Sequence, residues 1–281
     1  MLRSQHGLRL LSANDLPEVL ALLASDPVQN VFVDYRARLT RLEPRWLGGE
    51  IWGWFQDGRL TSLCHAAANL VPVLAEEEAL LAYAERAMRK GRVCSTIVGP
   101  QDQVEVLWGE LEPRWDAPRE VRLAQPHLEV SGPPQVAPDP LVRRSERADV
   151  EALYPACVAM YTEEVGISPE WDGGRDLYHA RVAQLVHRGW SFARYDEGRV
   201  VFKAEIACAS PYACQVQGVY VAPERRGEGL AAAGMAAVVE IARRDIAPVV
   251  SLYVNEHNVP ARATYERVGF VQTATFSTVM F

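Results

Sequence analysis

Two arginines and two glycines separate a β-branched run from an alanine-rich segment in VYVAPERRGEGLAAAGMAAVVE, residues 219–240. Glycine adopts backbone conformations that other residues avoid, and it places no Cβ between the backbone and a ligand. The first turn of a helix also carries unpaired N–H donors and a partial positive charge. A glycine-containing loop that leads from a strand into a helix is therefore suited to hold an anionic group such as a diphosphate.

Two common phosphate-binding motifs are missing from the sequence. There is no GxxxxGK(S/T) loop for a nucleoside triphosphate, and no G-x-G-x-x-G followed by an acidic residue after the next strand. The alternative interpretation of residues 219–240 is an ordinary loop between a strand and a helix. A second segment bears on this choice, because LYVNEHNVPARATYERVGF, residues 252–270, again places a helix after a strand.

Together the two segments resemble the GNAT superfamily of N-acetyltransferases. The family signature Q/R-x-x-G-x-G/A, directly after the strand-like run QVQGVYV, is matched by Arg226, Gly229 and Ala231. The family's closing pattern N-x-x-A-x-x-x-Y-x-x-x-G-F is matched by Asn258, Ala261, Tyr265, Gly269 and Phe270. The resemblance covers roughly residues 141–281.

This resemblance implies acetyl-CoA as the donor substrate and requires no metal ion. The diphosphate would lie on the backbone amides of the loop and the first helical residues, which are Arg226, Gly227, Glu228, Gly229, Leu230 and Ala231. The pantetheine arm would pair like an added strand with Val219, Tyr220 and Val221. Asn258 would also contact the cofactor.

Acetyl transfer by direct attack needs a neutral amine, donors for the developing oxyanion and a proton for the departing thiolate. The resemblance places Tyr265 near the sulfur, where its phenol would supply that proton; the alternative is a core aromatic packed on Val268 and Phe270. Many family members carry a carboxylate on the strand before the loop, but CQVQGVYV has none. Glu205 on the neighbouring strand is therefore the candidate base, since burial among apolar residues would raise its pKa. The alternative for Glu205 is an ion pair or a solvent-facing position.

The elements around these residues occur twice in the sequence. LRLLSANDLPEVLALLAS and LVRRSERADVEALYPACVAM each predict a short strand, a capping turn and a helix. WGWFQDGRLTSLCHAA and FARYDEGRVVFKAEIA each predict a hairpin with an Asp-Gly or Glu-Gly turn. We therefore expect a mixed α/β fold of two tandem GNAT-like domains, each a mostly antiparallel central sheet flanked by helices.

The proline-rich stretch SGPPQVAPDP, residues 131–140, is the expected linker between these domains. Residues 141–281 form the expected acetyl-CoA-binding domain. Residues 1–130 form a degenerate domain without the cofactor motif, because LAEEEA stands where the phosphate loop would be. Three glutamates at a helix start suit the helix dipole but repel a diphosphate, so we predict a scaffold or acceptor-site wall there.

Composition excludes several classes of protein. The 281 residues are 49% hydrophobic and 23% charged with a net charge of −7, which argues against nucleic acid and anionic membranes as general partners. The N-terminus lacks the apolar core of a signal peptide, and no segment is long enough to span a bilayer, so a cytoplasmic location is expected. The five cysteines are odd in number, contain no CxxC and are expected to be reduced. The oligomeric state stays open, with a homodimer as one expectation.

The leading functional hypothesis is an N-acetyltransferase acting on a primary amine of a small molecule or a protein. Glu163 and Glu164, expected in the loop after the first helix of the second domain, would attract a cationic amine or would simply be solvated. The alternative from a different class is a CoA-binding regulatory or sensor protein that has lost transferase activity. A purely structural module would leave the Arg-Gly-Glu-Gly loop unexplained.

Overall fold

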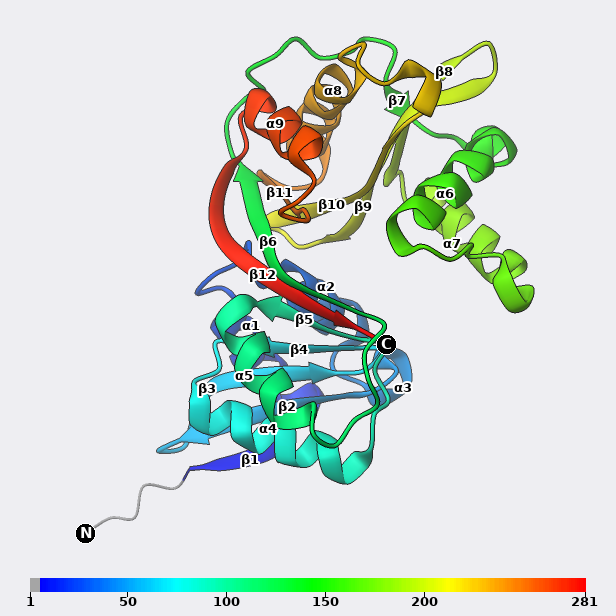
Figure 1. Cartoon of the computed structure of the whole chain (residues 1–281). Helices are drawn as coiled ribbons and strands as arrows, with labels where there is room; N and C mark the ends of the chain where they lie inside the picture. The colour runs from blue at the N-terminus through cyan, green and yellow to red at the C-terminus, as the bar shows by residue number, and fades with distance from the viewer. Residues whose placement is uncertain (1–5) are drawn as a thin grey trace. The chain divides into compact units, whose positions relative to one another are not determined.

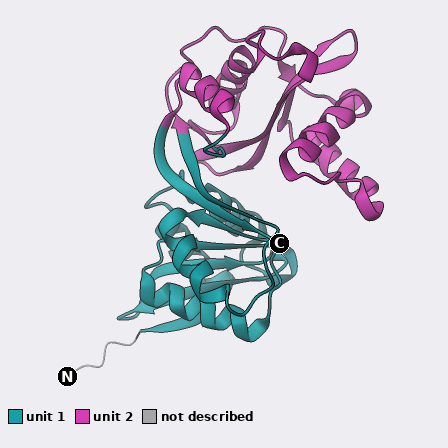
Figure 2. Cartoon of the chain, viewed as in Figure 1, with its two compact units in different colours: residues 1–128, 253–257, 272–281 teal, residues 129–252, 258–271 magenta. Residues whose placement is uncertain are grey.

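Two groups of residues form separate compact units in the computed structural model, which describes residues 6–281 (Figure 2). Unit 1 holds the residues up to Leu128 together with Tyr253–His257 and Gln272–Phe281, and unit 2 holds Glu129–Leu252 and Asn258–Val271. The first five residues, which begin the stretch examined above for a signal peptide, lie outside the described residues.

Unit 1 is built on strands in the order β1-β2-β3-β4-β5-β12-β6 (Figure 1). Neighbours from β1 to β4 are antiparallel, β4 and β5 are parallel, and β12 runs antiparallel to β5 from Phe276↔Pro100 to Met280↔Thr96. A strand from the end of the sequence thus belongs to the unit formed by its beginning. The strands are β1 Gly7–Leu10, β2 Glu50–Gln56, β3 Arg59–Ala66, β4 Asn69–Val73, β5 Thr96–Pro100, β6 Glu120–Val130 and β12 Val271–Met280.

Alternation along these strands gives unit 1 two cores, one on each face of the sheet. Trp52 and Trp54 point to the face covered by α4 and α5, whereas Ile51 and Leu63 point to the face covered by the first three helices. The alternating pattern that predicted hairpins in the sequence therefore also sets which helices cover which face. The helices are α1 Leu16–Leu23, α2 Val31–Thr40, α3 Pro44–Leu47, α4 Glu77–Lys90 and α5 Gln101–Leu111.

Unit 2 has a similar order of strands and helices along the chain. Its strands lie in the sheet in the order β11-β10-β9-β8-β7. All neighbouring pairs are antiparallel except β10 and β11, which are parallel. The predicted Glu-Gly hairpin turn is present, with Glu197 and Gly198 both at positive φ. The strands are β7 Arg143–Arg144, β8 Ser191–Asp196, β9 Arg199–Ala209, β10 Ala213–Val221 and β11 Val249–Tyr253.

Helices again cover unit 2 on both faces. α6 and α7 pack on Ala193 and Val200 of the sheet. α8 packs closely on β9, because a Cβ on Gly234 would lie 2.7 Å from the Phe202 ring. The helices are α6 Val150–Val165, α7 Arg175–His187, α8 Leu230–Asp245 and α9 Val259–Val268.

The mixed α/β prediction is confirmed, and the two units have a similar succession of strands and helices, except that unit 1 contains the additional short helix α3 and the strand β12. The compact units differ from the predicted domains at Glu129–Val130, which cluster with unit 2, and at two C-terminal segments, of which Tyr253–His257 is the shorter. Residues 272–281 were expected with the second half, whereas they cluster with unit 1. A strand's own sequence does not state which sheet edge it joins, because pairing is a long-range contact.

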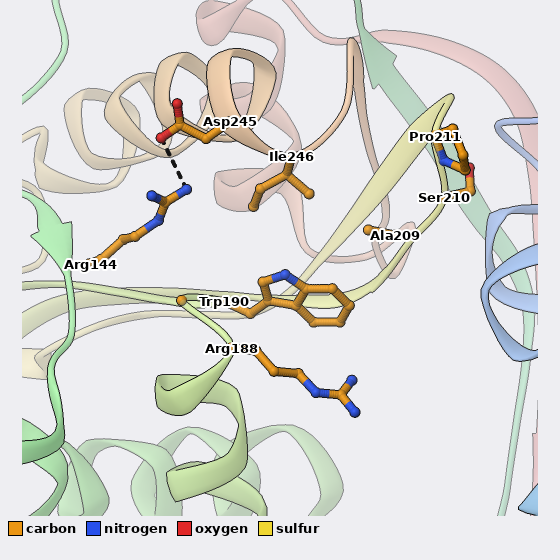
Figure 3. A pocket seen from close by; sticks show the side chains of 9 residues that line it. Arg144, Arg188, Trp190, Ala209, Ser210, Pro211, Asp245 and Ile246 are labelled. Atoms are coloured by element: carbon orange, nitrogen blue, oxygen red, sulfur yellow. Dashed lines mark ion pairs between the residues drawn. The ribbon is translucent and has the colours of Figure 1, made fainter. Parts of the chain in front are cut away.

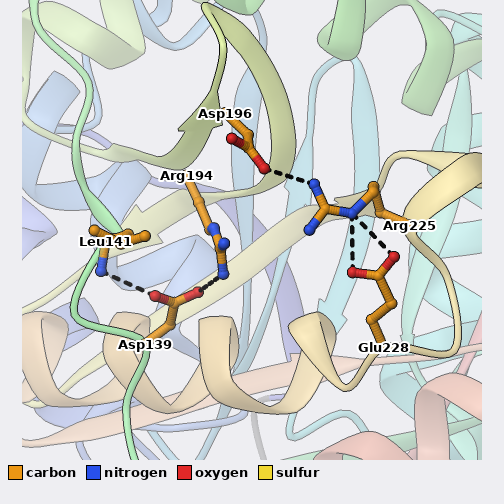
Figure 4. A network of polar contacts seen from close by, with 6 residues as sticks. All are labelled: Asp139, Leu141, Arg194, Asp196, Arg225 and Glu228. Atoms are coloured by element: carbon orange, nitrogen blue, oxygen red, sulfur yellow. Dashed lines mark hydrogen bonds and ion pairs between the residues drawn. The ribbon is translucent and has the colours of Figure 1, made fainter.

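The linker at residues 131–140 contains neither helix nor strand but is fastened to unit 2. The Gln135 N–H donates to the Val268 carbonyl and the Asp139 N–H to the Ala233 carbonyl, both at 2.9 Å. The Asp139 carboxylate accepts from Arg194 at 2.9 Å (Figure 4). The segment therefore lies against α8 and α9.

Within residues 6–281, no helix is long and apolar enough to cross a membrane. The five cysteines are buried and free. Cys208 is in register with Gln215 and Cys214 with Ala209, so the two cysteines beside the turn from β9 to β10 are not directly paired across the strands.

Candidate active site

The C-terminal part of β10 separates from its parallel neighbour. β10 pairs with β11 only over its first three residues, 213–215. Between Gln217 and Tyr220 the register with β9 shifts by one residue, because Gly218 at φ +60° forms a β-bulge. The predicted pantetheine-binding residues Val219, Tyr220 and Val221 follow the bulge and are half-buried. Among the described strands only β9 pairs with them, so the backbone on their other side is open to an added strand.

The loop after β10 presents backbone donors to open space. A short 3-10 turn, Pro223–Arg225, leads to Gly227 and Gly229, which have φ of +83° and +82°. Nothing lies within 4 Å of a Cβ built on either glycine. Gly229 is the N-cap of α8, where no side chain caps the helix and the first turn holds no acidic residue. The first-turn N–H groups, which include those of Leu230 and Ala231, have no acceptor within the helix and so suit the anion that the sequence predicts for this cradle of backbone donors.

Arg225 fixes the shape of this loop (Figure 4). Its guanidinium donates to Asp196 at 2.7 Å and to the Glu228 carboxylate at 2.9 Å. Asp196 ends β8, so the contact ties the loop to the neighbouring hairpin. The Glu228 side chain is occupied by this ion pair, which leaves only its backbone for the predicted contact with a diphosphate.

Arg226 of the signature forms an ion pair with Glu163, a residue that was predicted to lie in a loop. Its guanidinium donates to Glu163 at 2.7 Å and to the Val221 carbonyl at 3.2 Å. Glu163 and Glu164 lie in the last turn of α6 rather than in a loop, because the helix continues until Gly166 adopts a left-handed conformation at φ +79°.

A buried ionic cluster lies beneath the bulge. Lys203 is fully buried, and its ammonium lies 3.2 Å from the Glu205 carboxylate. Gln217 donates to the other Glu205 oxygen at 2.9 Å. Burial alone would lower the pKa of Lys203, but the adjacent Glu205 carboxylate outweighs burial and raises that pKa overall. The pair keeps Lys203 charged inside the protein.

Lys203 was not among the residues predicted for the site, although the sequence contained a signal for it. Residues two apart on a strand share a face, so VFKAEIA places Lys203 and Glu205 side by side. Gly218 belongs to the same arrangement, because a Cβ there would lie 3.1 Å from the Lys203 ammonium. The alternative interpretation of Glu205 as a member of an ion pair is thus the one seen in its contacts.

Tyr265 is buried in α9, with 7% of its surface exposed. Its ring packs edge-on against Phe270 with centroids 5.8 Å apart. Burial, with a smaller contribution from the Glu164 carboxylate, raises the pKa of the phenol well above its usual range. Tyr265 is protonated at neutral pH, as a phenol of ordinary pKa also is.

The other predicted cofactor residue in this region caps a helix. The Asn258 side chain is the N-cap of α9 and accepts a hydrogen bond from the Ala261 N–H at 3.2 Å. Asn258 is exposed, so its amide remains accessible to solvent. Tyr265 and Glu205 both lie in unit 2 but have different neighbours. The phenol of Tyr265 lies near Phe270 and Glu164. The Glu205 carboxylate contacts Lys203 and Gln217.

A cavity of about 530 Å³ in unit 2 lies away from this loop, at the C-terminal end of α8 (Figure 3). It shares no lining residue with the cradle. Within residues 6–281, no group of histidine, cysteine or acidic side chains is arranged to hold a metal ion.

Comparisons with known proteins agree with this geometry. Residues 153–270 match the Acetyltransferase (GNAT) family, and residues 49–153 match a domain of unknown function, DUF4081. Among proteins of curated function, none matches the sequence.

Several solved structures share the fold. A GCN5-related N-acetyltransferase from Sphaerobacter thermophilus is 17% identical with a TM-score of 0.59, covering 100% of this chain and 97% of that one. A GNAT-family acetyltransferase from Colwellia psychrerythraea is 12% identical with a TM-score of 0.55, covering 98% and 99%. A tandem GNAT protein from the clavulanic acid biosynthesis pathway is 14% identical with a TM-score of 0.55, covering 98% of each chain. These likenesses confirm the predicted fold of two tandem domains.

Proposed function

We propose that this protein is an acyltransferase that transfers the acetyl group of acetyl-CoA to a primary amine, because residues 153–270 match the Acetyltransferase (GNAT) family. One observation carries this proposal. An open strand edge, two left-handed glycines and an uncapped helix N-terminus follow one another from β10 into α8. Such a succession suits a ligand that joins an extended, amide-containing arm to a diphosphate.

The residues of unit 2 divide the binding of acetyl-CoA between them. Val219–Val221 would pair through their backbone with the pantetheine arm. The N–H groups from Arg226 to Ala231 would hold the diphosphate, and the open space around Gly227 and Gly229 would admit it. Asn258 would contribute its exposed amide.

The transfer step assigns proton movements to two side chains. The amine nitrogen forms a bond to the acetyl carbon, the bond from that carbon to sulfur breaks, and the amine loses one proton while the sulfur gains one. We assign the proton given to sulfur to Tyr265, whose phenol carries a proton at neutral pH. Backbone N–H groups beside the bulge would meet the charge that develops on the carbonyl oxygen.

Glu205 is proposed to accept the amine proton, since it is the carboxylate beside the bulge. Its contacts with Lys203 and Gln217 also give it the role of counter-ion to a buried cation. These two roles predict different behaviour when Lys203 is removed together with Glu205.

A CoA-binding regulatory or sensor protein is the second candidate. The observation that favours it is that both Glu205 carboxylate oxygens already have partners, Lys203 and Gln217, which leaves them less available to an incoming amine. On this interpretation the cradle binds acetyl-CoA and no amine is acetylated.

Calorimetry with acetyl-CoA followed by a thiol-release assay on a panel of amines tests the proposal. We expect binding, and CoA release that depends on both the amine and the protein. Binding without release for any amine would support the regulatory alternative. No binding to the folded protein would contradict both, because neither explains a cradle that holds no CoA.

A further inference from the structure

The Arg226 side chain reaches the edge of β10 that has no partner strand. The Ala222 N–H donates to the Val201 carbonyl of β9 at 3.1 Å. Successive residues of a strand direct their N–H and carbonyl groups to opposite edges, so those of Val221 point away from β9. The Arg226 Nε donates to this Val221 carbonyl at 3.2 Å. One of the groups proposed to pair with the pantetheine arm therefore already has a partner.

The same guanidinium is tied to α6. The Arg226 Nη2 donates to the Glu163 carboxylate at 2.7 Å. Glu163 lies in the last turn of α6, which ends where the Gly166 N–H donates to the Thr162 carbonyl at 2.9 Å. The two paired side chains are 47% and 56% exposed, so water and competing ions reach this ion pair. Arg226 thus links the open strand edge to the end of a helix through a contact of modest strength.

A diphosphate competes strongly for this arginine. A guanidinium binds phosphate oxygens through charge-assisted hydrogen bonds, often two in parallel. In the proposed function the diphosphate lies on the backbone amides from Arg226 to Ala231, so it is held beside the arginine's own backbone. Filling the cradle therefore offers the guanidinium a new acceptor that carries more negative charge than the Glu163 carboxylate.

We propose that Arg226 is a latch, closed in the free protein and opened by acetyl-CoA. When the ligand enters, the guanidinium exchanges the Val221 carbonyl and the Glu163 carboxylate for phosphate oxygens. The Val221 carbonyl then accepts from the pantetheine arm, and the last turn of α6 loses a contact. Glu163 is a positioning residue here, since it acts through Arg226. The inference rests on the proposed binding of acetyl-CoA in the cradle, and it holds whether or not an amine is acetylated.

Hydrogen exchange of the full chain, with and without saturating acetyl-CoA, tests the latch. We expect the amides of residues 163–166 to exchange about two- to fivefold faster in the complex, because the turn loses an exposed ion pair. The amides of residues 227–231 should exchange more slowly, because they donate to the diphosphate. Faster exchange at the helix end together with slower exchange in the cradle is the expected result.

Calorimetry on variants separates the latch from simple charge repulsion. Glu163→Gln removes the charge that holds Arg226 and should raise the acetyl-CoA affinity by about two- to fivefold. Arg226→Gln still fits the signature Q/R-x-x-G-x-G/A and opens the latch without ligand. In this variant residues 163–166 should exchange fast in the free protein, with no further rise in the complex. The double variant should bind acetyl-CoA as Arg226→Gln does, because Glu163 acts through Arg226.

Glu151→Gln is the matched control. Glu151 lies at the opposite end of α6, where its carboxylate contacts the His179 ring at 3.1 Å. The control removes the same charge from the same helix without touching Arg226. It should change neither the acetyl-CoA affinity nor the exchange of residues 163–166.

Two results would overturn the latch while leaving the proposed function in place. One is unchanged or slower exchange of residues 163–166 when acetyl-CoA binds. The other is a gain in affinity from Glu163→Gln that persists in the Arg226→Gln background, because Glu163 would then merely repel the ligand. Absence of acetyl-CoA binding, or binding that leaves the exchange of residues 227–231 unchanged, would contradict the proposed cradle and the latch together.

Discussion

The two units start from one arrangement and differ where a strand leads into a helix. β4 and β10 each pair with a parallel neighbour over only two or three residues, at Asn69–Leu70 and at 213–215. In unit 1 the rest of β4 is buried and Pro72 packs against Gly99. In unit 2 the bulge at Gly218 leaves the end of β10 open.

The helices that follow β4 and β10 differ in the residues at their N-termini. The N-cap of α4 is Glu76, with two more glutamates in the first turn, whereas the N-cap of α8 is Gly229 with no acid after it. The seventh residue of α5 is the buried Leu107, and the seventh residue of α9 is Tyr265. Ligand binding and proton donation are thus proposed from a few positions on a shared scaffold.

The largest expected effect concerns the buried ion pair of unit 2. Glu205→Gln leaves the Lys203 ammonium buried without its counter-ion, so we expect a loss of about 3–5 kcal/mol in the free energy of unfolding. Glu85→Gln in unit 1 removes an exposed ion pair with Arg89 and should cost about 1 kcal/mol or less. Denaturant unfolding measures both.

The double variant Lys203→Met with Glu205→Gln then separates the two roles of Glu205. It removes both buried charges, so most of the stability should return. A folded double variant with slow transfer would support Glu205 as the base. One with wild-type transfer would leave it only the counter-ion role.

The next effect concerns the phenol of Tyr265, the seventh residue of α9, where the seventh residue of α5 is Leu107. Tyr265→Phe keeps the ring and its packing on Phe270, so stability and acetyl-CoA affinity should change little. The transfer rate should fall by about 10²-fold at neutral pH, the usual scale for a positioned proton donor. Steady-state thiol release measures the rate, and an unchanged rate would return Tyr265 to a packing role.

The pH dependence of this loss has a defined sign. A thiolate leaves more easily near its own pKa of about 8.5, so the deficit should be largest at low pH and shrink as pH rises. Because the pKa of Tyr265 is raised in the folded protein, ionisation favours the unfolded state above about pH 10, and assays belong below that value. Tyr83→Phe in unit 1 removes a phenol 2.8 Å from the Ser62 hydroxyl and should lower stability without altering the rate.

A smaller effect tests the two helix N-caps against each other. Gly229→Asp places a carboxylate against the proposed diphosphate and a side chain at φ +82°, so acetyl-CoA should bind more weakly by about tenfold or more. Calorimetry on a variant with wild-type circular dichroism measures this. The reverse change in unit 1, Glu76→Gly, should create no binding of acetyl-CoA, because the end of β4 stays buried. A second acetyl-CoA bound per chain would contradict this explanation of how the two units differ.

The smallest expected effect concerns the ion pair beside the cradle. Glu163→Gln frees Arg226 for a phosphate, so acetyl-CoA affinity should rise by about two- to fivefold, within the range of exposed ion pairs. Raising the salt concentration should reduce the difference between variant and wild type. Glu78→Gln at the start of α4 in unit 1 should leave the affinity as it was.

Local sequence signals predicted much of the fold. The Asp-Gly and Glu-Gly turns are present at Asp57–Gly58 and Glu197–Gly198, all four residues at positive φ. The glycines of the loop are left-handed, as an anion cradle requires. These features depend on neighbours in sequence, which is why composition and spacing indicate them.

Contacts between distant segments could not be predicted in the same way. The pairing of Arg226 with Glu163 joins residues 63 positions apart, and no pattern in either segment indicates it. Lys203 was accessible through strand alternation, but the bulge that encloses it depends on how β9 and β10 pair. The strand with which β12 pairs is likewise determined by tertiary contacts, since a strand with an alternating pattern fits either sheet.

The place of β12 has a consequence for how the protein is made. Ser277 pairs with Gly99, so β5 emerges from the ribosome long before its partner strand has been synthesised. N-terminal domains usually fold first during synthesis, but here the first unit lacks a strand until residues 272–281 exist. In the interval the edge of β5 exposes unpaired backbone groups to other nascent chains. We therefore expect the nascent chain, rather than the mature protein, to be most prone to aggregation and most in need of a chaperone.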